Sequence, residues 1–187
     1  MKQKIVDNPV FSFYLPSDVG VEGEFRVGTI DSSKFDGNLT WIPIIKREGT
    51  SYWKISVQNM QLGNDSVSSV KEAIVDSGTS LIVGPSDEVD KILQILKAEN
   101  VGGIHIVDCD SVNRLPLLTL KIGDRAFELI PEDYIMRQLG LCFVGINGMD
   151  FRKSNGDPFW ILGSVFLRRY FTVFDIGREH IGLALLK

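Results

Sequence analysis

The sequence predicts a mainly β chain with only a few short helices. Three observations support this prediction. Most apolar runs are short and rich in β-branched and aromatic residues, several of these runs form hairpin-like pairs, and only one segment has a clear helical spacing. With 187 residues, 44% of them hydrophobic, the chain can bury a core without metals or many disulfides. The length therefore indicates one domain, or two small ones at most.

The expected strands alternate polar and apolar residues or stop at turn residues. Pro43 marks its run as an edge strand, because proline cannot donate to a central ladder. Gly123-Asp124 and the segment 176–178 each join two runs and predict hairpins, and residues 31–38 have turn chemistry. The strands are expected at 10–15, 24–28, 41–45, 52–57, 117–122, 126–129, 171–175 and 180–185.

One helix is clear in the pattern. Residues 85–88 provide an N-cap and an acidic first turn, and Asn100 with the Gly102-Gly103 pair is expected to end the helix. Shorter helices are expected at 131–137 and 164–170. The apolar residues at i, i+3, i+4 and i+7 spacing in the first helix are Val89, Ile92, Leu93 and Leu96.

Composition and simple motifs exclude several functions. The chain has 20 basic and 24 acidic residues, a net charge of −4, which argues against nucleic acid as a partner. No apolar run is long enough to span a bilayer, and residues 1–9 have no signal-peptide core, so they resemble the start of a fragment. The phosphate-binding glycine motifs and the serine-hydrolase elbow are absent from the sequence.

The two cysteines leave three interpretations open at this point. Cys109 and Cys142 can form one bridge, remain free thiols, or join His105 in a metal site. Metal is the weakest of the three, because His105 and Cys109 lack a close second pair of ligands. His105 and His180 have no nucleophile partner nearby in the sequence, so we expect both to be surface or packing residues.

The segment AIVDSGTSLIVGP at 73–85 is the strongest candidate for chemistry. An apolar strand delivers Asp76 directly into a tight turn lined with hydroxyls, and a second apolar strand follows. At the end of a buried strand a carboxylate is desolvated, and hydroxyls and N–H groups of the turn can fix its orientation. Gly78 leaves room for a substrate backbone to approach. The structural alternative is an aspartate that closes a β-turn through an Asx hydrogen bond.

Several further motifs, in order along the chain, favour the functional interpretation of Asp76. Together with DSGTS at 76–80, they resemble the C-terminal lobe of pepsin-like aspartic proteases, and they are similar to both cathepsin-D-like enzymes and plasmepsins. The segment 141–151 resembles the one that edges the substrate cleft in that family. The other motifs are GTIDSSKF at 28–35, GNLTWIPI at 37–44, YWKI at 52–55, and FWILG followed by VFLRRYFTVFD within 159–175.

The resemblance implies a fold, a mechanism and a division of the chain. The fold would be a single lobe of the pepsin-like acid protease fold, with β-barrel-like sheets and a few short helices. Residues 1–15 would be the interlobe strand and connection, and 16–187 the C-terminal lobe. Two aspartates, one from each lobe, would share a proton and activate a water that attacks the peptide bond. No cofactor and no metal are expected.

The resemblance also assigns roles to residues. Asp76 would be catalytic, Ser77 and Gly78 would complete its loop, and Thr79 would support it by a hydrogen bond. Substrate contacts are expected at Ile74, Gly78, Thr79, Ser80, Tyr52, Met149, Phe151 and Ile161. For the last four of these, ordinary core packing is the alternative. The segment expected to pack under the loop is Ile161, Leu162 and Gly163.

The chain matches the family pattern at one disulfide and departs from it at a second disulfide and at residue 164. Cys109 and Cys142 match the family's longer disulfide, so the resemblance implies that they are oxidised. Val67 and Lys71 stand where many members carry a short disulfide. Ser164 replaces the usual aspartate after Ile161-Leu162-Gly163, so we expect the intact enzyme's pH profile to differ from that of an aspartate-bearing relative.

The second aspartate motif is absent from the sequence. We therefore expect an aspartic endopeptidase that cuts between hydrophobic residues when paired with an N-terminal lobe, while the fragment alone is inactive. The expected partners are peptides and that lobe, not nucleic acid or a membrane. A secreted location or an acidic vacuole-like or lysosome-like compartment is expected, and Asn38 and Asn64 begin glycosylation patterns that fit it. Two alternatives remain: a homodimeric, retropepsin-like lobe, and a non-catalytic β-domain that binds a partner.

Overall fold

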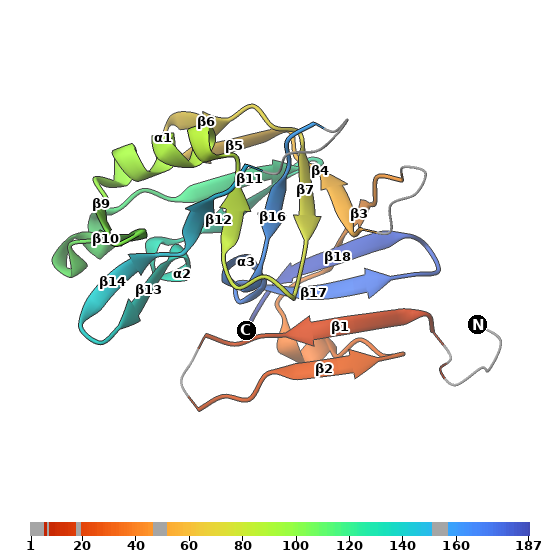
Figure 1. Ribbon diagram of the computed structural model, residues 1–187. Helices are drawn as coiled ribbons and strands as arrows, with labels where there is room; N and C mark the ends of the chain where they lie inside the picture. The colour runs from red at the N-terminus through yellow and green to blue at the C-terminus, as the bar shows by residue number, and fades with distance from the viewer. Residues whose placement is uncertain (1–5, 7, 18–19, 47–51, 151–156) are drawn as a thin grey trace. The chain divides into compact units, whose positions relative to one another are not determined.

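The computed structural model describes residues 6, 8–17, 20–46, 52–150 and 157–187. The chain divides into two compact units. Unit 1 comprises Met1–Ile55 and Leu167–Lys187, and unit 2 comprises Ser56–Phe166. Strands dominate both units and the helices are short, which confirms the predicted mainly β fold (Figure 1). Among the described residues, no helix is both long enough and apolar enough to cross a membrane.

Unit 1 is built on one antiparallel sheet in the order β2-β1-β17-β18-β3. Its centre, β17, is buried along its whole length, and the ring of Phe174 stacks on Phe11 at 4.7 Å between centroids. Pro43 lies in the edge strand β3, as its missing N–H predicts. The strands are β1 (Val10–Tyr14), β2 (Glu24–Val27), β3 (Thr40–Pro43), β17 (Tyr170–Asp175) and β18 (His180–Leu185), and a 3-10 turn, η1 (Ser32–Lys34), follows Asp31.

The described residues of unit 2 form three sheets. Their orders are β12-β11-β5-β6, β13-β14-β10-β9 and β15-β8-β16-β7, while β4 (Lys54–Ser56) crosses the division between the units. The strands are β5 (Asn59–Leu62), β6 (Asp65–Ser68), β7 (Glu72–Val75), β8 (Ile82–Gly84), β9 (Glu99–Val101), β10 (Ile104–Val107), β11 (Leu118–Ile122), β12 (Arg125–Leu129), β13 (Ile135–Gln138), β14 (Leu141–Val144), β15 (Ile146–Gly148) and β16 (Trp160–Leu162).

Besides η1, the described part of the chain has four helical segments, and the three that the sequence predicts are shorter than expected. The four segments are α1 (Ser86–Leu96), the 3-10 segment η2 (Cys109–Arg114), α2 (Pro131–Tyr134) and α3 (Ser164–Leu167). The main helix ends at Leu96 because Lys97 adopts a left-handed conformation with φ of 53°, and its N–H donates to the carbonyl of Gln94. Gly102 and Gly103 instead form the turn between β9 and β10.

The predicted helix at 131–137 is wrong in its second half. Residues from Ile135 onward form β13, because they pair with β14 in the register Ile135 to Val144. Tyr134, at the end of α2, is fully buried, and its hydroxyl donates to the carbonyl of Pro116 at 2.6 Å. Burial raises the pKa of this phenol, so it stays a neutral hydrogen-bond donor.

A disulfide joins η2 to β14. Cys109 and Cys142 lie 5.4 Å apart between their Cα atoms and are bonded, which confirms the bridge that the family resemblance implies. The open alternatives of free thiols and a metal site are therefore wrong. His105 contacts Asn100 instead, at 3.2 Å between Nε2 and Nδ2, and the described residues contain no cluster of three metal-ligating side chains.

Replacing both cysteines by serine is expected to lower the free energy of unfolding by about 3–4 kcal/mol, because the bridge closes a loop with a sequence separation of 33. Urea unfolding of the oxidised chain and of the Cys109→Ser, Cys142→Ser double variant measures this difference. A reducing agent should affect the parent chain only. Equal unfolding midpoints for the two proteins would show that the bridge adds no stability.

Candidate active site

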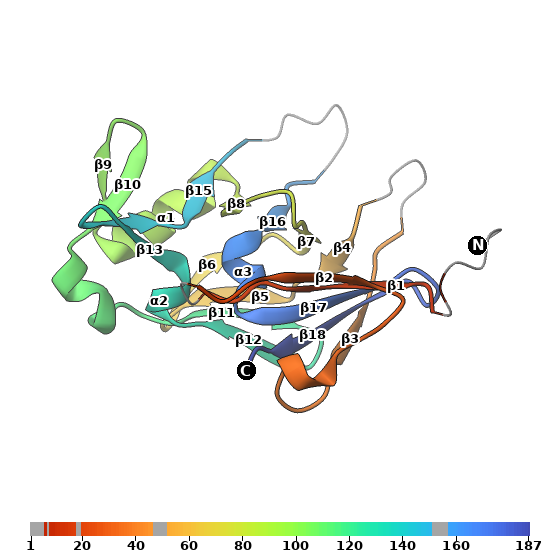
Figure 2. The same cartoon turned by 90° about the horizontal axis from the view of Figure 1, so that it is seen from below.

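Asp76 lies in the turn that joins β7 to β8, at the end of a fully buried strand. Strand β16 lies beside both of these strands. It pairs with β7 in parallel, Leu162 opposite Val75, and with β8 antiparallel, Leu162 opposite Ile82 (Figures 1 and 2). The backbone N–H of Asp76 extends this pairing by donating to the carbonyl of Leu162 at 3.1 Å. The register between β7 and β16 therefore places Asp76.

Two donors from its own turn fix the Asp76 carboxylate. The N–H of Gly78 donates to Oδ1 at 2.9 Å, and the hydroxyl of Thr79 donates to Oδ2 at 2.6 Å. The first contact is the Asx hydrogen bond that the structural alternative predicts, and the second is additional. The carboxylate is half-buried and not fully desolvated. Each oxygen accepts one hydrogen bond from the turn and has a lone pair left for a further donor such as water.

The segment after β16, residues 163–165, packs against the backbone of the Asp76 turn. A Cβ on Gly163 would lie 2.3 Å from the carbonyl oxygens of Thr79 and Leu81, so only glycine allows this close approach. The next two residues donate to the same turn, Ser164 N to Thr79 O at 2.7 Å and Val165 N to Ser80 O at 3.1 Å. Backbone contacts that depend on a missing side chain thus hold the turn on this segment.

The remaining candidates have different surroundings. Ser77 and Ser80 are exposed on the turn. Ile74 is buried opposite the half-buried Ile161, and Leu162 is fully buried. Met149 is 48% exposed, and its N–H donates to Gly84 O. Tyr52 belongs to unit 1 and is 63% exposed, and Phe151 lies outside the described residues.

Sequence reasoning missed two polar residues of unit 2 that support these strands. Asp150 caps α1, because its Oδ1 accepts from Ser86 N at 3.1 Å, and Pro85 at the N-cap position provides no side-chain cap. Glu88 is 3% exposed within the same helix. Its position, four residues before the buried Ile92, was the available signal, since a charged residue on the apolar face of a helix needs partners.

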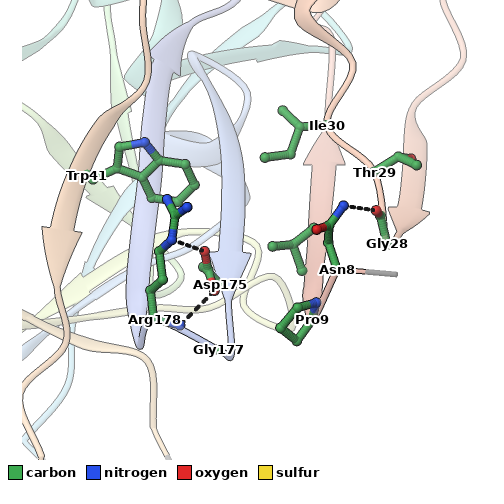
Figure 3. Close-up of a pocket in the computed structure, with 10 residues that line it drawn as sticks. Asn8, Pro9, Gly28, Thr29, Ile30, Trp41, Asp175, Gly177 and Arg178 are labelled. Atoms are coloured by element: carbon green, nitrogen blue, oxygen red, sulfur yellow. Dashed lines mark hydrogen bonds and ion pairs between the residues drawn. The ribbon is translucent and has the colours of Figure 1, made fainter. Parts of the chain in front are cut away.

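A hollow of about 340 Å³ lies within unit 1 (Figure 3). The figure shows Trp41, Ile30 and Pro9 around it, with Arg178 beside Asp175. The carboxylate of Asp175 is already engaged: Oδ1 accepts from Arg178 N at 2.8 Å, and Oδ2 lies 3.8 Å from Arg178 Nε. These contacts close the turn between β17 and β18, so Asp175 is a structural residue.

Comparisons with known proteins identify the family to which this chain belongs. The profile of the family described as eukaryotic aspartyl protease matches residues 1–186. The chain is 39% identical to gastricsin of Mus musculus over 96% of its length, 38% identical to cathepsin D of Homo sapiens over 98%, and 40% identical to pepsin A of Bos taurus over 97%. These matches cover 46%, 46% and 49% of the relatives, so the chain spans about half the length of the curated relatives it matches. The chain belongs to the eukaryotic aspartyl protease family.

Proposed function

We propose that this chain provides one half of the active site of an aspartic endopeptidase, with Asp76 as its catalytic residue. The observation that carries the proposal is the geometry of the Asp76 carboxylate. Both of its oxygens are fixed by donors, at 2.9 and 2.6 Å, at the half-exposed end of a buried strand. A carboxylate held in one orientation and still open to water is suited to general base catalysis.

The proposed mechanism needs a second carboxylate. Two close carboxylates cannot both ionise without a large cost, so they share one proton. The ionised member takes a proton from the bound water as that water attacks the peptide carbonyl carbon, and the protonated member donates to the carbonyl oxygen. The chain has no second motif of the Asp76 type, and it spans about half of its relatives. We therefore assign residues 16–187 to a C-terminal lobe, 1–15 to the interlobe connection, and the other aspartate to an N-terminal lobe.

The proposed substrates are peptides with large apolar side chains beside the cleaved bond. The exposed apolar side chain of Met149, at one of the expected subsite positions in unit 2, supports this class, because apolar surface favours apolar ligands. The Cys109–Cys142 bridge supports an oxidising compartment. We propose secretion or an acidic vacuole-like or lysosome-like compartment, where a shared proton on the carboxylate pair is readily maintained.

Asp76→Asn is expected to lower peptidase activity by about 10²–10⁴-fold, because an amide cannot act as a general base. The assay uses an apolar peptide at acidic pH and the chain combined with the second lobe. Asp90→Asn, at an exposed position of α1, is the control and should retain activity.

The same assay on the chain alone separates the alternatives. The proposal expects no activity without the second lobe. Activity of the isolated chain that rises with the square of its concentration would favour the homodimer and contradict the two-lobe assignment. Full activity of Asp76→Asn would overturn the catalytic role.

Thr79→Val is expected to reduce kcat by about 10–100-fold, because it removes a hydrogen bond to a charged oxygen while keeping the side-chain volume. Thr79→Ser keeps the hydroxyl and should retain most of the activity. Steady-state kinetics of the two variants measure the difference. Equal rates for valine and serine would mean that the hydroxyl does not orient Asp76.

Ser164→Asp is expected to move the acid limb of the pH–activity profile to higher pH, by about one pH unit. Ser164 N is bonded to Thr79 O, and the Thr79 hydroxyl donates to Asp76, so a carboxylate at position 164 adds negative charge beside the Asp76 turn. That charge disfavours ionisation, which then requires a higher pH. Ser164→Asn has a similar shape without the charge and should leave the profile in place. An aspartate profile that coincides with the parent's would refute this expectation.

A further inference from the structure

The proposed function leaves a buried carboxylate in unit 2 unexplained. Glu88 lies in the first turn of α1 and is 3% exposed. Burying a charge is costly unless hydrogen bonds or opposite charges compensate for it. In the described part of the chain, the groups that donate hydrogen bonds to Glu88 are all neutral. Among the described residues, the Glu88 carboxylate is therefore held by hydrogen bonds and not by a salt bridge.

The donors come from two other segments. At Oε1, the N–H of Ser69 donates at 2.7 Å and its hydroxyl at 3.1 Å. At Oε2, the hydroxyl of Ser68 donates, and the indole Nε1 of Trp160 donates at 3.1 Å. Ser68 links the group further, since its Oγ accepts from Trp160 Nε1 at 2.9 Å and from Val70 N at 3.1 Å. We call Glu88, Ser68, Ser69 and Trp160 the Glu88 network.

This network ties together the elements that deliver the Asp76 turn. Ser68 and Ser69 lie where β6 ends and the chain turns toward β7, between Val67 and Lys71. Trp160 is fully buried, begins β16 and pairs with Ala73 of β7. Its ring also lies against the end of β8, where a Cβ on Gly84 would come within 2.3 Å of the indole.

The indole therefore contacts three elements at once: Glu88 of α1, Ser68 at the end of β6, and Gly84 of β8. These contacts fix the position of β16. Two residues further along β16, Leu162 accepts from Asp76 N, and Gly163 and Ser164 then carry the Asp76 turn. A shift of Trp160 along β16 would move this support directly, because a strand transmits displacement along its length. The network reaches the proposed catalytic residue through one short strand.

We propose that Glu88 is a positioning residue, which acts through Trp160 and β16 to hold the Asp76 turn in register. The term positioning rests on the proposed function, whereas the mechanical link between Glu88 and the turn does not. A carboxylate suits this role because it accepts several hydrogen bonds at once from fixed directions. An apolar side chain of the same size could fill the space but would leave the indole and both serines without this common acceptor.

The experiment measures amide hydrogen exchange in Glu88→Gln, with Asp87→Asn as the matched control on the exposed side of the same turn. The glutamine side chain of the first variant keeps the volume but replaces one accepting oxygen by an NH₂ donor. Exchange at Asp76, Gly78 and Ser164 is expected to accelerate by about 10–100-fold, the effect of losing a hydrogen bond to a charged group. Exchange in the β11–β12 hairpin of the same unit should change less than about twofold.

Two further variants keep the test decisive if Glu88→Gln does not fold. Trp160→Phe removes only the indole N–H donor and its ring portion, and Ser68→Ala removes only the hydroxyl. Both are expected to give the same local pattern. In the folded double variant of Glu88→Gln with Trp160→Phe, the effects should be less than additive, because both changes remove the same interaction.

Kinetics add a readout that separates this inference from the proposed function. In the chain combined with its second lobe, Glu88→Gln should lower kcat while KM stays within about twofold, since the turn is displaced but the apolar subsites are not. If Asp76→Asn retains activity, the proposed function fails while the exchange result still tests the link. Amide exchange that accelerates equally throughout unit 2, or that does not accelerate at the Asp76 turn, would overturn the inference.

Discussion

The parallel pairing of β16 with β7 is the interaction on which the Asp76 turn of unit 2 depends. It sets Leu162 opposite Val75, so that the Asp76 turn begins with a hydrogen bond to the neighbouring strand. The absent side chain of Gly163 then allows the turn's carbonyls to approach the segment after β16. The β7–β16 register and the missing Cβ of Gly163 thus place the Asp76 carboxylate. Gly78 and Thr79 then set its orientation.

The sequence predicted best those elements whose signal is local. The two hairpins around β11 and β17 and the edge strand with Pro43 were recognisable because turn residues and alternation act over a few positions. The end of α1 and the strand β13 were mispredicted for a different reason. Lys97 ends the helix in a left-handed conformation that lysine seldom adopts, and Ile135 becomes a strand only because β14 is available to pair with it.

The candidate site shows the same division between local and distant signals. Asp76, Gly78 and Thr79 lie within four consecutive residues, so their arrangement could be inferred from a motif. The Glu88 network could not, because Trp160 lies 72 residues from Glu88 and 92 from Ser68 in the sequence. Only the position of a charged residue on the apolar face of α1 indicated that something polar had to meet it. The periodicity of the sequence does not predict long-range polar contacts of this kind. They can be identified only from the three-dimensional arrangement of the strands.

In the proposed enzyme, Asp76 is one half of a carboxylate pair that faces a peptide substrate. A crystal structure of the chain with its second lobe and an apolar peptide, in which a secondary alcohol replaces the cleaved carbonyl, would test this pairing. We expect this hydroxyl to lie within hydrogen-bonding distance, about 3 Å, of an Asp76 oxygen and of an aspartate from the other lobe. A bound peptide whose hydroxyl contacts neither carboxylate, with Asp76 still closed on Gly78 and Thr79, would contradict it.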